Sequence, residues 1–282
     1  MKVSGTSAVV IGGGSGVGRG IALGLAAAGA RVVVGDIDPS SADEVRNEIE
    51  SAGGLAVSAR VDSTERDSLD SLASVAEAEH GGVQILASNV GVLTSTPLDR
   101  ASERDWSWSL ELNVLSHVRA VDVFLPHLRA GGPPAHIVLT ASLAAVYVPP
   151  TIAETHLGVY TATKHAVLGY GETLRNELEP ESIGVSVLCP GMVQSNLVAT
   201  SARHRPERHG GPFTPAMPAA SDREQTQLLG MLPPEAVGPV VVRGIEANRA
   251  HILTHPYSLG LIEERHGVLV DDFRFFAEPP PG

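Results

Sequence analysis

Tyr160 and Lys164 are the two residues whose types and spacing are best suited to chemistry. They are four residues apart in GVYTATKHAV, residues 158–167, a segment whose other residues are typical of a helix. Side chains four apart on a helix are neighbours, so the phenol and the ammonium would share one environment. A phenol with a pKa of about 10 is a poor base at neutral pH, and a neighbouring ammonium is expected to lower that pKa. The alternative is a tyrosine at the edge of the core beside a lysine that extends to water.

A glycine-rich turn follows the first apolar run of the chain. The run SAVVI, residues 7–11, leads into GGGSGVG, residues 12–18, and a helix is predicted to start near Gly16. Glycines at such a turn allow the backbone to approach a pyrophosphate, which the amides of the helix N-terminus then bind. Three residues separate Gly12 from Gly16, whereas the usual pattern has one. The pattern alone would also fit a tight turn, but its position between a strand and a helix favours dinucleotide binding.

Asp36 ends the second apolar run, 18 residues beyond Gly18. An acidic residue there would bind the adenosine ribose hydroxyls and repel a 2′-phosphate. No Arg or Lys directly precedes Gly16, and Arg19 and Arg31 are interpreted as surface charges. The pattern therefore favours NAD over NADP. The alternative is that Asp36 is an acid near the start of the helix at Pro39.

Short β-branched runs alternate with helical patterns along the chain, which predicts an α/β fold with a doubly wound parallel sheet. We assign residues 1–282 to a single Rossmann-type domain with helices on both faces of seven strands. Ser40 and Ser102 are predicted to begin helices, and Asp105 completes a capping-box pattern with Ser102. The predicted strands span 7–11, 31–35, 55–60, 83–88, 136–141, 184–189 and 251–254, and the predicted helices 16–29, 40–52, 64–80, 102–130, 159–179 and 234–248.

Composition limits the class of partner. The formal net charge is −12 and aromatic residues make up 4% of the chain, which disfavours nucleic acid and anionic lipid as partners. No apolar run is long enough to span a membrane, and the N-terminus lacks a secretory pattern. The single cysteine, Cys189, excludes an internal disulfide and is compatible with a cytoplasmic location. His251 and His255 flank a predicted strand without a nearby Glu, so no metal site is predicted.

Two regions depart from the strand–helix alternation. Residues 196–232 are rich in Pro, Arg, His and Gly, and a segment of this kind in a compact domain is often a substrate loop or lid. From about residue 275 the chain ends in AEPPPG, which cannot continue a helix and predicts a loose tail.

Several motifs together resemble the short-chain dehydrogenase/reductase family over about residues 5–255. They are GGGSGVG at 12–18, SNVG at 88–91, Asn113, TAS ending at Ser142, YTATK at 160–164 and PGMVQS at 190–195. The resemblance implies that Tyr160 is the general acid/base and that Lys164 binds the nicotinamide ribose and favours the phenolate. It also implies that Ser142 binds the substrate oxygen and that Asn113 holds a water that relays protons from Lys164.

The same resemblance implies a cofactor site for NAD. Asp62 and Ser63 would contact the adenine, Asn89 and Gly91 would line the inner ribose, and the segment after Cys189 would frame the nicotinamide carboxamide. With Tyr160 and Lys164, the full predicted set is Gly12, Ser15, Gly16, Val17, Gly18, Asp36, Ile37, Asp62, Ser63, Asn89, Val90, Gly91, Pro190, Gly191, Val193 and Ser195.

The chain departs from the family pattern in three ways. Ile11 replaces a usual threonine, and Ser88 and Val90 replace polar or small residues of the usual NNAG, which predicts a more apolar junction between two strand ends. Ser142 and Tyr160 are 18 residues apart, a few more than usual, and the extra residues lie in VYVPPTIAETHLG. This loop is expected to border the substrate and shape specificity, although a neutral surface insertion is the alternative.

These observations predict an NAD-dependent oxidoreductase that interconverts a secondary alcohol and a ketone. A weaker resemblance, in TASLA, RPER and ANRAHILTHP, is to dehydrogenases of aryl-ether benzylic alcohols. Arg203, Arg205 and Arg208 would add positive charge to the substrate pocket if the lid folded inward. Trp108 is assigned to core or subunit packing. The predicted pocket walls are mostly apolar: Val92, Leu93, Val146, Tyr147, Met192 and the 196–232 lid.

Two other functions remain open: a non-catalytic NAD-binding regulator on the same fold, and a sugar-nucleotide epimerase or dehydratase. The second usually has a larger C-terminal domain than this chain can supply. The family resemblance further implies a homo-tetramer or homo-dimer with the 102–130 and 159–179 helices at the interface.

Overall fold

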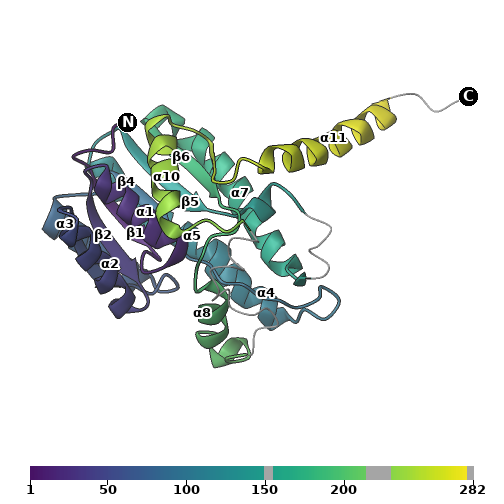
Figure 1. Ribbon diagram of the computed structural model, residues 1–282, viewed down its shortest axis with the longest axis horizontal. Helices are drawn as coiled ribbons and strands as arrows, with labels where there is room; N and C mark the ends of the chain where they lie inside the picture. The colour runs from purple at the N-terminus through teal and green to yellow at the C-terminus, as the bar shows by residue number, and fades with distance from the viewer. Residues whose placement is uncertain (149–154, 214–229, 278–282) are drawn as a thin grey trace, which may run out of the picture.

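Seven parallel strands form one sheet in the order β3-β2-β1-β4-β5-β6-β7 (Figure 1). The computed structural model describes residues 1–148, 155–213 and 230–277. The predicted Rossmann-type α/β fold is confirmed, and most strand bounds agree with the prediction to within two residues. The strands are β1 (Ser7–Ile11), β2 (Arg31–Asp36), β3 (Leu55–Arg60), β4 (Ile85–Ser88), β5 (Ala135–Thr140), β6 (Ile183–Cys189) and β7 (His251–Leu253).

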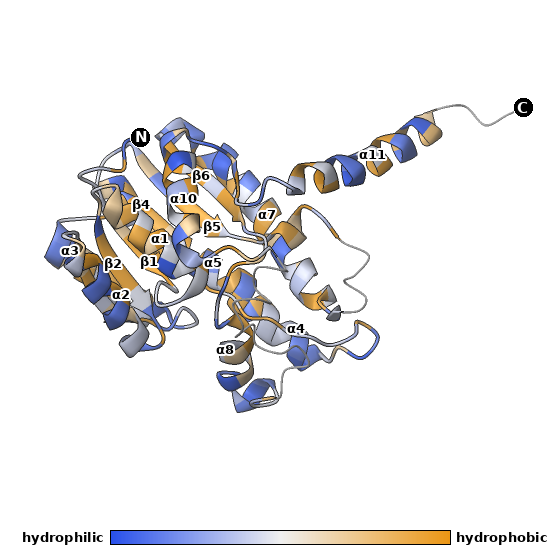
Figure 2. Ribbon diagram, in the orientation of Figure 1, coloured by the Kyte–Doolittle hydropathy of each residue, from blue (hydrophilic) through white to orange (hydrophobic). Residues whose placement is uncertain are grey.

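Helices cover both faces of the sheet. Alternate side chains of β1 point to opposite faces, so Ala8 and Val10 pack in one core while Val9 and Ile11 pack in the other. The first core lies under α1 (Gly16–Ala27), α2 (Pro39–Ser51) and α10 (Val237–Glu246), and the second under α3 (Arg66–His80), α5 (Ser116–Ala130) and α7 (Gly158–Leu178). Figure 2 shows the strands as mostly hydrophobic ribbons between helices of mixed character, as burial on both faces requires.

The predicted helix at 102–130 is interrupted. It consists of α4 (Glu103–Leu110), a π-helical turn at Glu111–Leu115 and then α5. Such turns are frequent at functional sites, and this one contains Asn113. Ser102 and Asp105 form the predicted capping box. The cap predicted at Ser40 is wrong, because Asp38 caps α2 and accepts the Ser40 amide.

Two helices were not predicted. The first, α8 (Leu197–Arg203), lies in the predicted lid, and a short 3-10 helix at Glu207–His209 follows it. The second, α11 (Ser258–Ala277), extends away from the body of the molecule at the C-terminal end (Figure 1). The predicted loose tail from residue 275 is therefore wrong for its first residues, which are helical to Ala277. Residues 149–154, 214–229 and 278–282 of the predicted insertion, lid and tail lie outside the described residues.

The carboxyl ends of the parallel strands meet at one edge of the sheet. At this edge β1 pairs with both β2 and β4, so the strand order reverses there. Ligands of open α/β sheets bind at such a reversal, outside the carboxyl ends of the strands. The glycine turn follows β1, and the segments of Asn89, Ser142 and Gly191 follow β4, β5 and β6. No helix in the described parts of the chain is both long enough and apolar enough to cross a membrane.

Candidate active site

The glycine turn after β1 brings the start of α1 close to the strand. Gly12 and Gly16 have φ angles of +74° and +52°, which residues other than glycine rarely adopt. A Cβ at Gly18 would lie 1.8 Å from the Gly12 carbonyl oxygen, so only glycine allows this approach. Ser15 precedes α1 without a side-chain cap bond, which leaves the first amides of the helix for another acceptor.

Asp36, at the end of β2, faces the glycine turn. Its Oδ2 accepts the Gly14 amide at 2.8 Å and its Oδ1 accepts the Asp38 amide at 3.1 Å. Burial raises the pKa of this carboxyl, and the backbone hydrogen bonds oppose that shift. Arg19, the nearest predicted cation, forms ion pairs with Glu48 and Glu235. The charge of Arg19 is therefore balanced by protein carboxylates.

The predicted adenine contacts lie beyond the third strand. Asp62 does not end β3, as the sequence suggested, because the strand stops at Arg60. Its Oδ1 accepts both the amide and the hydroxyl of Thr64, at 2.9 and 2.7 Å, which fixes a turn before α3. Ser63 is buried and Ile37 is exposed.

The end of β4 connects the glycine turn to the centre of the site. Asn89 Nδ2 donates to the Gly12 carbonyl at 3.1 Å. A Cβ at Gly91 would lie 3.2 Å from Lys164 Nζ and 3.3 Å from Asn113 Oδ1, so a glycine here allows close contact with two predicted catalytic residues. Val90 packs against the core.

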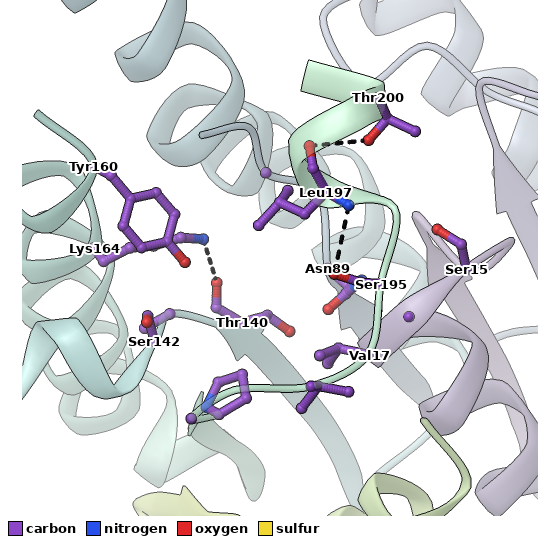
Figure 3. Close-up of a pocket in the computed structure, with 16 residues that line it drawn as sticks. Ser15, Val17, Asn89, Thr140, Ser142, Tyr160, Lys164, Ser195, Leu197 and Thr200 are labelled. Atoms are coloured by element: carbon purple, nitrogen blue, oxygen red, sulfur yellow. Dashed lines mark hydrogen bonds between the residues drawn. The ribbon is translucent and has the colours of Figure 1, made fainter. Parts of the chain in front are cut away.

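Tyr160 and Lys164 lie on the first turns of α7 and face Ser142 and Thr140 across the site (Figure 3). The Lys164 ammonium donates to the Thr140 carbonyl at 3.0 Å and lies 5.6 Å from the centre of the Tyr160 ring. Lys164 is 3% exposed, and burial lowers its pKa to about 8. The two side chains therefore share one environment, as their spacing predicted.

The predicted lowering of the Tyr160 pKa is wrong. Burial raises the pKa of the phenol, because the charged phenolate loses hydration, and a hydrogen bond with Ser142 only partly opposes this. Ser142 caps a short 3-10 helix, Leu143–Ala145, and accepts the Ala144 amide at 3.2 Å. The cap fixes the position of the Ser142 hydroxyl after β5.

Asn113 is fully buried in the π-helical turn and binds protein groups on all sides of its amide. Its Oδ1 accepts the Val92 amide at 2.6 Å, and its Nδ2 donates to the Val92 carbonyl and to Thr163 Oγ1, each at 3.0 Å. The side chain thus connects the loop after β4 to α7. Its predicted role in holding a water stays a prediction.

The segment after β6 closes the site from the other side. A Cβ at Gly16 would lie 2.6 Å from Ser195 Cβ, so this segment packs directly on the glycine turn. The Gly191 amide donates to His255 Nδ1 at 3.2 Å, and His255 is 4% exposed. Sequence reasoning missed this contact. The available signal was the position of His255 just after β7, the strand next to β6.

The junction of β4 and β1 differs from the predicted apolar repacking. Ile11 is buried in the core, but Ser88 Oγ lies 2.7 Å from His117 Nδ1. The junction therefore combines the predicted apolar contacts of Ile11 and Val90 with a polar pair that the sequence did not suggest. His117 is on α5, one turn after Asn113, and its proximity to Lys164 helps to lower its pKa.

A second set of contacts that the sequence did not predict fixes the described part of the lid against α4. Arg205 pairs with Asp105 at 2.8 Å, and both side chains are about nine-tenths buried. The guanidinium carbon lies 5.2 Å from the centre of the Trp108 ring and 5.8 Å from that of Phe213. Trp108 is thus a core residue, as predicted, and Arg205 serves packing instead of adding charge to the site. Ser201 Oγ also accepts the Leu93 amide, at 2.9 Å, which holds α8 to the loop after β4.

One cavity unites most of these residues (Figure 3). Its walls come from the glycine turn, the strand ends, α7 and α8, while five predicted pocket walls, Val92, Leu93, Val146, Tyr147 and Met192, are not among its lining residues. The lining consists of Ser15, Gly16, Val17, Asn89, Gly91, Thr140, Ala141, Ser142, Tyr160, Lys164, Pro190, Gly191, Val193, Ser195, Leu197 and Thr200. The other predicted site residues lie outside this lining: Gly12, Gly18, Asp36, Ile37, Asp62, Ser63, Val90 and Asn113.

The residues present fit a dinucleotide. The close Gly12–Gly18 approach forms a cradle that any Cβ would fill, and the uncapped start of α1 suits a pyrophosphate. The cradle and the Tyr160–Lys164 pair border the same cavity, as hydride transfer to a cofactor requires. Within the described residues, no group of three or more His, Cys, Asp or Glu side chains could hold a metal.

The family model for short chain dehydrogenases matches residues 6–206. The chain belongs to the short-chain dehydrogenase family. It is therefore an oxidoreductase of a family that uses NAD(P), consistent with the motifs and the fold.

The chain is similar to several proteins that are named as dehydrogenases. The chain is 28% identical over 277 residues to a C alpha-dehydrogenase of Sphingobium sp., covering 98% of this chain and 88% of that protein. It is 32% identical over 200 residues to the 1-deoxy-11-beta-hydroxypentalenate dehydrogenase of Streptomyces exfoliatus, covering 70% of this chain and 71% of that protein. A short-chain dehydrogenase/reductase from Burkholderia phymatum, solved in complex with NAD, has a TM-score of 0.83 and 31% identity, covering 100% of this chain and 99% of that one.

Proposed function

We propose that the chain is an NAD-dependent dehydrogenase that interconverts a secondary alcohol and a ketone. The main support for the proposal is that one cavity contains Tyr160, Lys164 and Ser142 beside the glycine turn. When bound, NAD supplies the hydride acceptor or donor, and its positively charged ring favours a phenolate nearby. The proposal treats the chain as one catalytic domain with a lid at 196–232.

Tyr160 is the proposed general acid/base. In the oxidising direction its phenolate accepts the hydroxyl proton of the alcohol, and in the reducing direction its phenol donates a proton to the carbonyl oxygen. Ser142 orients the substrate oxygen through a hydrogen bond. Lys164 stabilises the phenolate through its charge and is held in place by the Thr140 carbonyl. Because burial raises the Tyr160 pKa, we expect alcohol oxidation to accelerate in alkaline solution.

NAD is the proposed cofactor in preference to NADP. Asp36 accepts the Gly14 amide, so its carboxylate is fixed beside the glycine turn where a 2′-phosphate would have to be accommodated. Arg19 is already paired with Glu48 and Glu235 and is a poor partner for that phosphate. An Asp36→Ser variant should therefore lose preference for NAD over NADP by at least tenfold in kcat/KM. An unchanged preference would contradict this role of Asp36.

The proposed substrate is an uncharged alcohol with an apolar group, such as an aryl ring, next to the carbinol carbon. Leu197 of α8 lines the cavity, and Arg205 is buried against Asp105, Trp108 and Phe213. The relative from Sphingobium sp. is named C alpha-dehydrogenase, which supports a benzylic alcohol as the first class to test. The proposal also includes a cytoplasmic setting, in which the buried free Cys189 would stay reduced, and assembly as a homo-dimer or homo-tetramer.

The proposal is tested by incubating the protein with NAD and a panel of aliphatic, benzylic and steroidal secondary alcohols while following formation of NADH. The Tyr160→Phe variant should lose turnover by at least a hundredfold but still bind NAD. Tyr170→Phe is the matched control, because Tyr170 lies on the same helix but outside the cavity lining, and it should retain activity.

Two results would contradict the proposal. Full activity of Tyr160→Phe would remove the assigned role of the phenol. Binding of NADH without turnover of any alcohol in the panel would favour the non-catalytic, NAD-binding regulator.

A further inference from the structure

Helix α11 carries large apolar side chains into solvent. Of its 20 residues only Ser258 is buried, and Phe273, Phe275 and Phe276 are 76%, 74% and 82% exposed. The helix extends outward from the body of the molecule (Figure 1). An isolated helix of this length is marginal in water, because most helical stability in proteins comes from packing. The described part of this chain therefore leaves the apolar side chains of α11 uncovered.

The apolar residues of α11 form two stripes. The first stripe repeats at intervals of three and four residues, which is the spacing of a helix that packs along another helix. It consists of Leu259, Ile262, His266, Leu269, Phe273 and Phe276, of which His266 is the one polar member. Leu261, Val268 and Phe275 recur every seven residues and lie roughly 100° away around the helix. Figure 2 shows hydrophobic and hydrophilic segments in alternation along α11. A helix with two such stripes is suited to pack against protein, and we call the first stripe the α11 seam.

The charge of α11 favours protein over lipid as the cover. The helix carries four carboxylates, Glu263, Glu264, Asp271 and Asp272, against the two guanidiniums of Arg265 and Arg274. Helices that lie on membranes are usually rich in Lys and Arg, which anionic headgroups attract. The net charge of the chain, −12, likewise disfavours an anionic lipid surface.

The area to be covered fits a pair of chains. A phenylalanine buries about 150–250 Å² when covered, so the three exposed phenylalanines alone offer about 450 Å² per helix. Two such helices and the surfaces they cover would bury about 1,800 Å², within the range of a standard stable interface. The body of the same chain exposes apolar side chains that could receive the helix: Leu98, Leu110, Leu115 and Val148 are 40–60% exposed.

We propose that α11 is an association arm that packs against a second copy of this chain through the α11 seam. Each copy supplies an arm and receives one, as two-fold symmetry requires. The base of the arm contacts the segment after Ser142, where Arg265 Nη1 donates to the Ala145 carbonyl at 3.5 Å. The proposal does not depend on the reaction proposed above.

The first test measures the mass of the purified full-length protein by light scattering. The wild type should have at least twice the chain mass of 29.3 kDa. A Phe273→Glu/Phe276→Glu variant should dissociate to a smaller species, with an association constant at least a hundredfold weaker. Arg274→Glu is the matched control, because it changes the net charge by the same −2 but lies off both stripes, and it should keep the wild-type mass. NAD binding and circular dichroism report whether each variant is folded.

Three results of this test would overturn the proposal: a wild type with the mass of one chain, a double variant with the wild-type mass, or equal dissociation of the Arg274→Glu control. A monomeric wild type is also sedimented with phosphatidylcholine/phosphatidylglycerol vesicles. Binding there would assign the arm to lipid.

The second test does not depend on the folding of a charged variant. A photoreactive p-benzoylphenylalanine replaces Phe276 in the seam, or Arg274 as the control, in otherwise unchanged protein. Illumination of the Phe276 variant should give a covalent species of two chains, and the Arg274 variant should give at least tenfold less. Adducts confined to single chains at both positions would overturn the proposal.

Discussion

His117 and His136 are buried in the core as neutral side chains, and we expect them to make the fold sensitive to acid. His117 Nδ1 lies 2.7 Å from Ser88 Oγ, and His136 Nε2 lies 2.8 Å from Ser186 Oγ. Burial, together with the nearby charge of Lys164 or Arg175, respectively, lowers the pKa of both histidines to about 3. Neither side chain can accept a proton in the folded protein without an unpaired charge in the core.

The direction of the pH effect on stability follows from the protonation of the two histidines in the folded and unfolded chain. Below pH 6.5 the unfolded chain binds a proton at each histidine, whereas the folded chain does not until about pH 3. The stabilising contribution is therefore complete above pH 6.5 and is lost as the pH falls toward 3. Each histidine lowers the free energy of unfolding by about 1.4 kcal/mol per pH unit in that window. From about pH 8 to about pH 5 the two together remove about 4 kcal/mol, a large part of the typical 5–15 kcal/mol.

The measurement is urea unfolding at a series of pH values and one fixed protein concentration. His117→Asn and His136→Asn should each reduce the slope of the unfolding free energy against pH, below pH 6.5, by about 1.4 kcal/mol per pH unit. Any pH-independent cost of the substitution only shifts the curve. His204→Asn is the control, because His204 is exposed, and its slope should equal that of the wild type. Equal slopes for the wild type and both core variants would refute the reasoning.

Three further outcomes test the site. Gly18→Ala should weaken NAD binding at least tenfold in a fluorescence titration, because its Cβ would lie 1.8 Å from the Gly12 carbonyl oxygen; wild-type affinity would contradict the cradle. Arg205→Met should lower the free energy of unfolding by about 3 kcal/mol in urea, since it leaves a buried carboxylate unpaired; the exposed Arg203→Met should have little effect, and equal losses in both would argue against the ion pair. His255→Phe should raise the KM for NAD about tenfold, more than it changes kcat, because the Gly191 amide loses one of its two acceptors and keeps only Thr254 Oγ1; an unchanged KM would show that the His255 contact does not position the segment.

The parts of the site that depend on local spacing could be predicted. The glycine turn lies between a strand and a helix, and Asp36 ends the next strand, because apolar runs and turn residues near each other in sequence determine both. Tyr160 and Lys164 share one environment because one helical turn separates them. The family motifs added the remaining strand-end residues, most of which line the cavity.

The contacts between distant segments could not be predicted. Asp105 pairs with Arg205, Ser88 with His117, and Gly191 with His255, and no local pattern connects the members of these pairs. The helix α11 is a different case, because the three- and four-residue spacing of its seam was present in the sequence.

The sequence by itself determined the order of strands and helices, the glycine turn and the Tyr160–Lys164 spacing, because these depend on periodicity and on residues within a few turns of each other. Only the tertiary structure decided the electrostatics of the site. The ammonium alone was expected to lower the Tyr160 pKa, but burial by several converging segments raises it and lowers that of Lys164 to about 8. Hydration lost on burial is a property of the assembled site, and the spacing of two residues along one helix does not contain it.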